Sequence, residues 1–401
     1  MAERTPLYGR HLAAGARMVE FAGWEMPLQY TSVREEQQAV RAGAGLFDVS
    51  HMGRFDVLGS GAGAFLQRLV TNDLSRLTSS RAQYDLSCRP DAGIVDDLVV
   101  YRLEGEWRVV GNAANRGKDL EWMRAHAPAG VEVVDRTEEL SLIALQGPSA
   151  RTLLPAGDVE PGSLPRFGVA RTAVAGVEVL ISRTGYTGED GFELFVAAAR
   201  AAQVWDALVE AGARPCGLAA RDVCRLEAGL RLYGHDMDET TNPYEVGLGW
   251  VVKLDKGPFL GREALRRIRD RGPARNLIGL IARDRIVPRA GAIVRREERS
   301  IGSVTSGTYS FWLGAGIGMA LVEAGTAPVG ARVELDLAGR RGSAEVVPLP
   351  FYRGTVPSGT RPGASPGPGR VVRPQPGAGA APGITAEEDD TRGGALLHRD
   401  P

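Results

Sequence analysis

Two adjacent aspartates, Asp96 and Asp97, stand inside an apolar segment and are the first candidates for chemistry. The segment reads IVDDLVVY over residues 94–101, and its apolar, β-branched residues predict a strand. Because side chains alternate across a strand, Asp97 shares a face with Tyr101, while Asp96 lies on the opposite face. A carboxylate on such a strand must be paired, hydrogen-bonded or functional, since burying it bare is costly. The pattern fits a functional carboxylate or, equally, an edge strand whose aspartates cap neighbouring backbone.

A second candidate is the glycine-rich segment RTGYTGEDGFE, residues 183–193. Its three glycines recur every three residues and predict a tight, irregular loop. Loops of this kind can bring the backbone close to a ligand. The plainer interpretation is a glycine-rich hairpin connection, and the pattern by itself favours it slightly.

Arg221 and Arg225 are a third candidate, because residues four apart share a helix face. Arginines on one face could form forked hydrogen bonds to a ligand carboxylate. However, the chain contains 45 arginines and only three lysines, a bias that GC-rich codon usage explains. A solvated or internally paired helix is therefore the favoured interpretation of these two arginines taken alone.

Other catalytic motifs are missing from the sequence. It contains no Walker A motif, GxSxG elbow, HExxH motif or zinc-finger spacing, and only five histidines. The GxGxxA match at residues 59–64 lacks a parallel βαβ context, so a strand-to-helix turn is favoured over dinucleotide binding. Three cysteines without CxxC spacing predict no disulfide framework and a reducing, cytoplasmic environment.

The composition is that of an ordinary globular protein of 401 residues, with 43% hydrophobic and 24% charged residues. The formal net charge of −1 provides no global field to attract nucleic acid or an anionic membrane. No apolar run reaches the roughly 18 residues of a membrane-spanning helix. We therefore expect neither a nucleic-acid nor a membrane partner.

The elements that must position these residues interleave helices and strands as far as residue 275. Predicted helices and one hairpin are, in order, the helix 32–43 with a Ser32–Glu35 capping box, the hairpin 94–101 with 107–112, a helix around 204–209 closed by Gly212, and the helices 221–230 and 262–271.

Beyond residue 275 only short β-like runs follow, at 277–282, 292–295, 301–305, 317–322, 332–337 and 343–348. This switch predicts a small C-terminal β-barrel or sandwich. Residues 357–401 hold 8 prolines, 9 glycines and no aromatic residue, which predicts a disordered tail.

The chain resembles the aminomethyltransferase family, the T-proteins of the glycine cleavage system, over roughly residues 5–355. The resemblance rests on these segments in order: FAGWEMPLQY (21–30), LFDVSHMG (46–53), TND (71–73), GIVDDLVVY (93–101), SRTGYTGEDGFEL (182–194), ARDVCRLEAGLRLYGHDMDETTNPYEVGLGWVVKLDK (220–256) and PFYRG (350–354). It implies an α+β, three-lobed, clover-like molecule. Two interleaved α+β lobes would occupy residues 1–272, a β-barrel 273–356 and the tail 357–401.

The family's reaction starts from an aminomethyl group on the dihydrolipoyl arm of the carrier H-protein. It releases ammonia and passes the one-carbon unit to tetrahydrofolate, giving 5,10-methylenetetrahydrofolate. The resemblance therefore implies tetrahydrofolate as co-substrate and lipoylated H-protein as partner, with no metal and no nicotinamide. A carboxylate near the reacting folate nitrogens would orient the folate and stabilise cationic intermediates.

Motif matching implies a role for Asp97 as the critical carboxylate, with Asp96 as its structural partner. The implied folate-pocket and channel residues are Tyr84, Tyr101, Asn112, Tyr186, Glu193, Arg221, Trp250 and Arg353. Glu193 would accept hydrogen bonds from pterin N–H groups, and Arg221 would hold the polar tail of folate or the pocket geometry. The chain departs from the family pattern at Leu230, where an aromatic residue is usual, and at Phe311-Trp312.

Two alternative functions stay open on the sequence. One is a folate-dependent demethylase or another one-carbon enzyme on the same scaffold. The other is a non-catalytic folate-binding module, against which the intact pair of acids argues.

Overall fold

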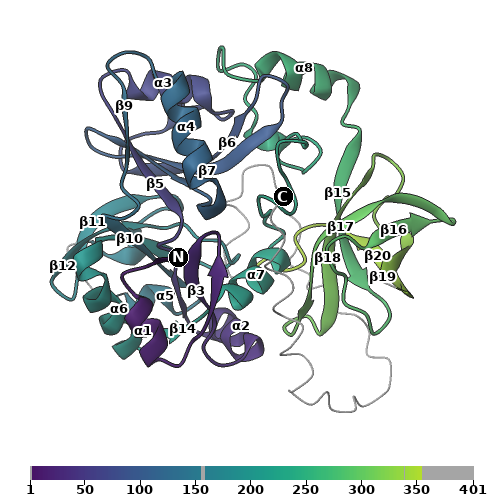
Figure 1. Ribbon diagram of the computed structural model, residues 1–401, viewed down its shortest axis with the longest axis horizontal. Coiled ribbons are helices and arrows are strands. Elements are labelled where there is room, and N and C mark those ends of the chain that lie inside the picture. Colours follow the sequence, from purple (N-terminus) through teal and green to yellow (C-terminus); the bar gives the residue numbers. More distant parts are fainter. Residues whose placement is uncertain (1, 155–158, 338, 355–401) are drawn as a thin grey trace. The chain divides into compact units, whose positions relative to one another are not determined.

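The order of the elements places the chain in the α+β class, as predicted, with a barrel of strands at its C-terminal end (Figure 1). The computed structural model describes residues 2–154, 159–337 and 339–354. The predicted tail, 357–401, lies outside the described residues. The α-helices are α1 (Tyr8–Ala13), α2 (Val33–Ala42), α3 (Ala62–Leu69), α4 (Arg116–His126), α5 (Ala150–Leu153), α6 (Ala201–Glu210), α7 (Leu218–Glu227) and α8 (Arg262–Arg271).

The strands before α8 form three sheets, through which the chain passes in alternation. The small sheet has the order β1 (Glu3–Arg4), β3 (Trp24–Gln29), β2 (Arg17–Phe21). The six-stranded sheet has the order β11 (Val169–Val174), β12 (Val177–Ser182), β13 (Gly191–Ala197), β10 (Leu140–Gln146), β4 (Gly45–Asp48), β14 (Arg214–Pro215). The five-stranded sheet has the order β6 (Arg81–Cys88), β7 (Ile94–Arg102), β8 (Trp107–Gly111), β5 (Gly53–Leu58), β9 (Glu132–Asp135). Because β4 and β10 pair while β5 to β9 build another sheet, the two larger units interleave as expected.

The C-terminal strands close into a barrel, which confirms the predicted β-barrel. Its strands, in order around the barrel, are β15 (Arg275–Ala282), β18 (Ala315–Glu323), β17 (Arg299–Ser310), β16 (Ile293–Arg296), β19 (Arg332–Leu337) and β20 (Arg340–Val347). Each predicted β-like run overlaps one of these strands. Closure removes the unpaired sheet edges that short antiparallel strands would otherwise expose.

Several local predictions are confirmed at the level of single residues. The Ser32 side chain caps α2 by accepting the N–H of Glu35. The hairpin of β7 and β8 forms, and α8 covers the predicted range. The predicted helix 221–230 begins earlier and ends at Glu227, because Gly229 takes a φ of +63° that a right-handed helix cannot include.

The turn at residues 59–64 connects β5 to α3, as the favoured interpretation expected. Strand β5 pairs antiparallel with β8 and with β9. A dinucleotide-binding unit needs parallel strands around its crossover helix, so the topology excludes that alternative.

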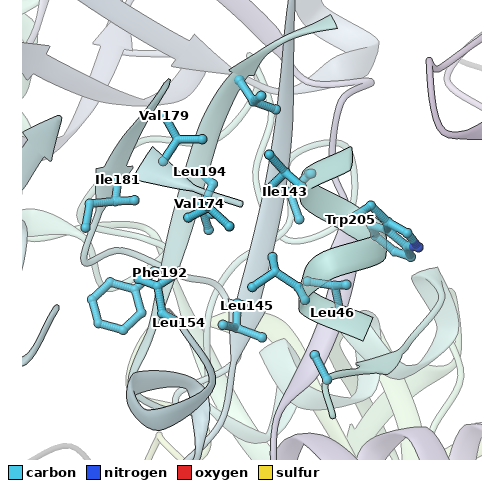
Figure 2. Close-up of a cluster of buried hydrophobic side chains, with 14 of the residues drawn as sticks. Leu46, Ile143, Leu145, Leu154, Val174, Val179, Ile181, Phe192, Leu194 and Trp205 are labelled. Atoms are coloured by element: carbon cyan, nitrogen blue, oxygen red, sulfur yellow. The ribbon is translucent and has the colours of Figure 1, made fainter. Parts of the chain in front are cut away.

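The six-stranded sheet is covered on both faces, and this brings the two larger sheets together. On one face Ile143, Leu145 and Leu194 pack with Trp205 of α6 (Figure 2). On the other face Phe195 packs with Tyr101 of β7, with ring centroids 5.2 Å apart. The strands that carry Asp97 and Glu193 therefore belong to sheets that share one hydrophobic core.

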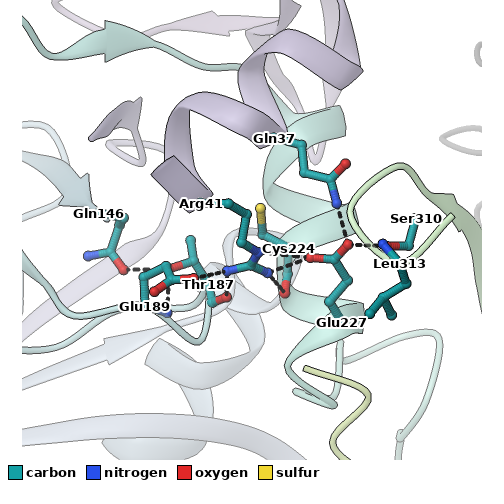
Figure 3. A network of polar contacts seen from close by, with 9 residues as sticks. All are labelled: Gln37, Arg41, Gln146, Thr187, Glu189, Cys224, Glu227, Ser310 and Leu313. Atoms are coloured by element: carbon teal, nitrogen blue, oxygen red, sulfur yellow. Dashed lines mark hydrogen bonds and ion pairs between the residues drawn. The ribbon is translucent and has the colours of Figure 1, made fainter. Parts of the chain in front are cut away.

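A buried polar junction around Arg41 of α2 ties α7, the glycine-rich loop and the barrel together (Figure 3). The guanidinium forms ion pairs with Glu189 at 2.8 Å and with Glu227 at 2.6 Å, and all three side chains are buried. It also donates to the carbonyl of Thr187 at 2.8 Å. Glu227 accepts hydrogen bonds from Gln37 on α2 and from Ser310 at the end of β17.

The junction contains two carboxylates and one guanidinium. Burial raises the pKa of Glu227, and the charge of Arg41 opposes that shift. Removing a single partner from such a cluster leaves buried charge without compensation, which costs more than the pair itself contributes.

We expect Arg41→Met to lower the free energy of unfolding by about 3–5 kcal/mol, because two buried carboxylates lose their cation. Denaturant unfolding would show this as a lower midpoint with an unchanged slope. The control is Arg10→Met, since Arg10 forms an exposed pair with Asp206 and solvent screens it. Equal midpoints for the two variants would contradict the importance of the junction.

Candidate active site

The Asp96–Asp97 pair lies on a central strand, because β7 pairs with β6 on one side and with β8 on the other. Strand β7 is therefore not an edge strand of the sheet, and that part of the alternative is wrong. However, its pairing with β8 starts only at Val99 and leaves Asp96 and Asp97 just beyond the end of β8. Asp96 is completely buried and Asp97 is half-buried, on opposite faces as the alternation predicts. One part of the alternative does hold: β8 ends at Gly111, and Asp96 accepts the next backbone N–H, from Asn112, at 3.0 Å.

Asn112 connects the two carboxylates. Its Nδ2 donates to Asp96 Oδ1 at 2.8 Å and to Asp97 Oδ1 at 2.7 Å. Asn115 donates a further hydrogen bond to Asp96 Oδ1 at 2.6 Å. Asp96 thus accepts three N–H donors, which is how a buried carboxylate is stabilised in its charged form.

Asp97 has a different environment. Its second oxygen accepts the Tyr84 hydroxyl at 3.0 Å. Burial raises the pKa of Asp97 to about 7, with a further contribution from the negative charge of Asp96, while Asn112 and Tyr84 oppose the shift. A carboxyl group with a pKa near neutrality can serve as an anion or hold a proton.

Aromatic rings lie beside this carboxylate. The Tyr84 ring is nearly parallel to that of Trp250, with centroids 6.1 Å apart and an interplanar angle of 24°. Trp250 lies on the short 3-10 helix Gly249–Val251 and is 41% exposed, so the aromatic pair reaches the surface. Flat, partly apolar surfaces of this kind suit a planar ring system.

The glycine-rich segment is a hairpin connection between β12 and β13, as the plainer interpretation held, and it carries two of the candidates. The Tyr186 hydroxyl donates to the carbonyl of Arg231, and burial together with the charge of Asp97 raises the pKa of Tyr186. Glu193 lies on β13, is 8% exposed and accepts the Thr184 hydroxyl.

Arg221 and Arg225 share α7 but have different partners. Arg225 is buried and pairs with Asp222 and Asp236, so the internally paired interpretation is correct for it. The Arg221 guanidinium lies over the Tyr186 ring, 5.0 Å from its centroid. Burial lowers the pKa of Arg221, the charge of Glu193 opposes this, and Nη1 finds no hydrogen-bond partner among the described residues.

Contacts and electrostatics link most of the predicted residues into one site. Tyr101 is buried, and burial together with the Glu193 charge raises its pKa, so it lies on the Glu193 side. Arg353 is exposed near the last described residue, and within the described part of the chain it makes no hydrogen bond or ion pair with the other candidates. The next residue, Gly354, packs against the Gly188 carbonyl of the glycine-rich loop, and no contact among the described residues joins Arg353 to the acid pair.

Two neighbours of the site were missed on the sequence. Arg231 donates to the carbonyls of Gly229 and Val246, and its charge lies close enough to oppose the raised pKa of Tyr84. Asn115 holds Asp96. The only signal for Asn115 was a second asparagine three residues beyond Asn112 at the end of a strand.

Among the described residues, no group of three or more potential protein ligands could hold a metal ion. No helix in the same part of the chain is long and apolar enough to cross a membrane. The arrangement itself offers a carboxylate that titrates near neutrality, aromatic walls, and a buried acid and guanidinium that can bind complementary polar edges of a ligand.

Comparisons with known proteins cover nearly all of the described chain. A model of the GCVT N-terminal domain matches residues 7–256, and a model of the glycine cleavage T-protein C-terminal barrel domain matches residues 275–353. The chain is 48% identical to the aminomethyltransferase of Geobacillus kaustophilus over 361 residues, which cover 88% of this chain and 99% of that protein. It is 49% identical to the aminomethyltransferase of Symbiobacterium thermophilum over 366 residues, covering 88% and 97%. The crystal structure of glycine cleavage system aminomethyltransferase T from Bartonella henselae superposes with a TM-score of 0.82 at 34% identity, covering 88% and 99%.

We expect the two neighbours of Asp97 to shift its titration in opposite directions. Tyr84→Phe removes a donor to the charged form and should raise the pKa of Asp97 above about 7, whereas Asp96→Asn removes a negative charge and should lower it. Carbon-13 NMR of aspartate-labelled protein measures both shifts. Shifts of the same sign in the two variants would contradict the assigned causes.

Proposed function

The chain belongs to the aminomethyltransferase family, the T-proteins of the glycine cleavage system, and we propose that Asp97 stands at the reacting centre of its tetrahydrofolate-dependent reaction. The family function is the transfer of an aminomethyl carbon to tetrahydrofolate with release of ammonia. The observation that supports this role for Asp97 is its geometry. It is a half-buried carboxylate, held by Asn112 and Tyr84, beside aromatic rings that reach the surface.

Tetrahydrofolate is the proposed co-substrate, and the polar groups of the site fit its chemistry. A pterin ring presents N–H donors and a carbonyl acceptor on its edges and flat faces above and below. Glu193 would accept from such N–H groups, and Nη1 of Arg221, which has no hydrogen-bond partner among the described residues, would donate to an acceptor. Tyr84 and Trp250 would line the flat faces.

Asp97 would act by orientation and charge. In its ionised form it accepts hydrogen bonds from a bound N–H group and stabilises positive charge that develops beside it. Holding two reactants in attack geometry supplies up to roughly 7–11 kcal/mol of a barrier in ideal cases. Asn112 contributes by fixing the carboxylate oxygen that it contacts, so that Asp97 does not have to reorganise during the reaction.

The carrier H-protein with its lipoyl arm is the proposed partner, and the cytoplasm is the proposed location. The proposed domain limits are 1–272 for the folate-binding region and 273–356 for the barrel. In their support, α8 ends at Arg271 and the first barrel strand begins at Arg275.

The direct test of the function is an assay with purified, aminomethyl-loaded H-protein, run with and without tetrahydrofolate. We expect stoichiometric ammonia and 5,10-methylenetetrahydrofolate only when both substrates are present. Methyl transfer from a small sulfonium or amine substrate, without activity on H-protein, would assign the chain to the demethylase alternative instead.

Asp97→Asn should reduce kcat by about 10²–10³-fold while folding and folate binding are retained, because the variant loses charge and keeps its shape. Steady-state kinetics and folate titration separate the two effects. The matched control is Asp255→Asn, which removes the charge of an exposed aspartate. Near-normal turnover of Asp97→Asn would rule out the assigned role.

Glu193→Ala should weaken folate binding first. Loss of a charged hydrogen-bond acceptor is expected to raise the Kd for tetrahydrofolate by about tenfold or more, with a smaller effect on kcat at saturating folate. Isothermal titration and kinetics measure both quantities, and Glu193→Gln serves as the control that keeps an acceptor oxygen. A variant with normal folate affinity would remove Glu193 from the pocket.

A further inference from the structure

A third carboxyl group, that of Asp119 on α4, lies behind the Asp96–Asp97 pair and has no place in the reaction described above. We propose that Asp119 is a positioning residue for Asp97 that acts as a neutral acid, donating a hydrogen bond to Asp96. Its effect on turnover rests on the proposed role of Asp97, whereas its proton can be tested without any substrate.

The geometry places Asp119 against Asp96 in the protein interior. Asp119 is 3% exposed, and its Oδ2 has no hydrogen-bond donor among the described residues. Both carboxyl groups border Gly111. If this glycine carried a Cβ atom, that atom would lie 2.6 Å from Asp119 Oδ2 and 3.1 Å from Asp96 Oδ2. A glycine at this position therefore leaves the space in which the two groups meet.

Two buried carboxyl groups that both border Gly111 are not ionised together, because their repulsion adds to the cost of desolvation. One of them must hold a proton, and the hydrogen bonds indicate which one. Asp96 accepts three N–H donors, two from Asn112 and one from Asn115, whereas no donor in the described part of the chain reaches Asp119 Oδ2. The proton therefore belongs on Asp119.

The charged groups around Asp119 act in both directions: the charges of Asp96 and Asp97 raise its pKa, and the Lys118 ammonium opposes them without outweighing burial. From β7, Asp96 meets it beside Gly111, while Asp97 lies on the opposite face of the strand. The Lys118 ammonium, on the same helix, contacts the Tyr233 hydroxyl at 2.8 Å and the Glu239 carboxylate at 3.4 Å. Tyr233 in turn donates to the carbonyl of Ile94. Burial raises the pKa of Asp119 to about 11, and the charge of Asp96 adds to the shift.

A chain of hydrogen bonds connects this proton to the reacting carboxylate. In the proposed arrangement Asp119 donates to Asp96, which accepts from the side-chain amide of Asn112, and the same amide donates to Asp97. If Asp96 loses its support, Asn112 can turn and Asp97 loses a donor. A displacement of a catalytic group by about 1 Å is enough to reduce turnover strongly.

The first test is the pH dependence of thermal stability. Unfolded Asp119 ionises above its ordinary pKa of 3.8, whereas in the folded protein it stays neutral up to a far higher pH, so its burial destabilises the folded state increasingly as pH rises. The Asp119→Asn side chain cannot ionise, so this variant should not show the loss of stability that Asp119 causes as pH rises. The difference in Tm between the variant and the parent should therefore become more positive from pH 5 to pH 8.

Asp119→Ser also cannot ionise, and it should show the same trend whatever its absolute Tm. The matched control is Glu121→Gln, on the same helix but exposed, for which the difference should not change with pH. A pH-independent difference for the Asp119 variants would overturn the proposal, because Asp119 would then be ionised in the folded protein.

The second test is kinetic. Asp119→Asn keeps an N–H donor toward Asp96 and should retain kcat within about threefold, whereas folded Asp119→Ala should lose about 10–100-fold in kcat with little change in KM for folate. Equal kcat for the Ala and Asn variants would overturn the positioning role. If Asp97→Asn proved active, the proposed function of Asp97 would fail even where the Tm trend held, so the two failures are distinguishable.

Discussion

The completely buried carboxylate of Asp96 imposes the constraint around which the candidate site is built. A buried charge needs hydrogen-bond donors, and those donors are Asn112 and Asn115 in the segment that follows β8. Because Asn112 serves Asp96, its amide is also held against Asp97. The donors that Asp96 requires thereby hold its neighbour in position, and the Asp96 charge adds to the burial that raises the pKa of Asp97.

The requirement that a buried charge be compensated by nearby partners also applies at the Arg41 junction, elsewhere in the fold. Two buried carboxylates and one guanidinium are stable only together, so α2, α7, the glycine-rich loop and the end of β17 must meet there. The loop that carries Tyr186 is held through Thr187 and Glu189. Arg41 thus supports one side of the site without touching its chemistry, much as Asp96 supports the other.

The two arginines of α7 show why residue patterns left the site open. Their spacing correctly predicted one helix, but it could not distinguish their partners. Arg225 pairs with Asp236, which lies beyond the helix in the chain, while Arg221 lies over Tyr186 from the glycine-rich loop. Which arginine forms an ion pair and which lies over an aromatic ring depends on those distant residues, and the abundance of arginine in this sequence hides the difference.

The sequence by itself determined the elements whose signals are local. Ser32 caps α2, the hairpin of β7 and β8 follows its alternation, α8 covers its apolar stripe, and the β-like runs after residue 275 became the barrel strands. Ordered motifs likewise identified the family. Only the tertiary structure decided that Asp96 is buried, that Asp97 titrates near neutrality and that Asp119 lies behind them. Desolvation and Coulomb interactions depend on distances in space. The groups that surround the acid pair lie on or next to β6, β8 and α4, which are far apart in the chain, so no local sequence pattern reveals their proximity.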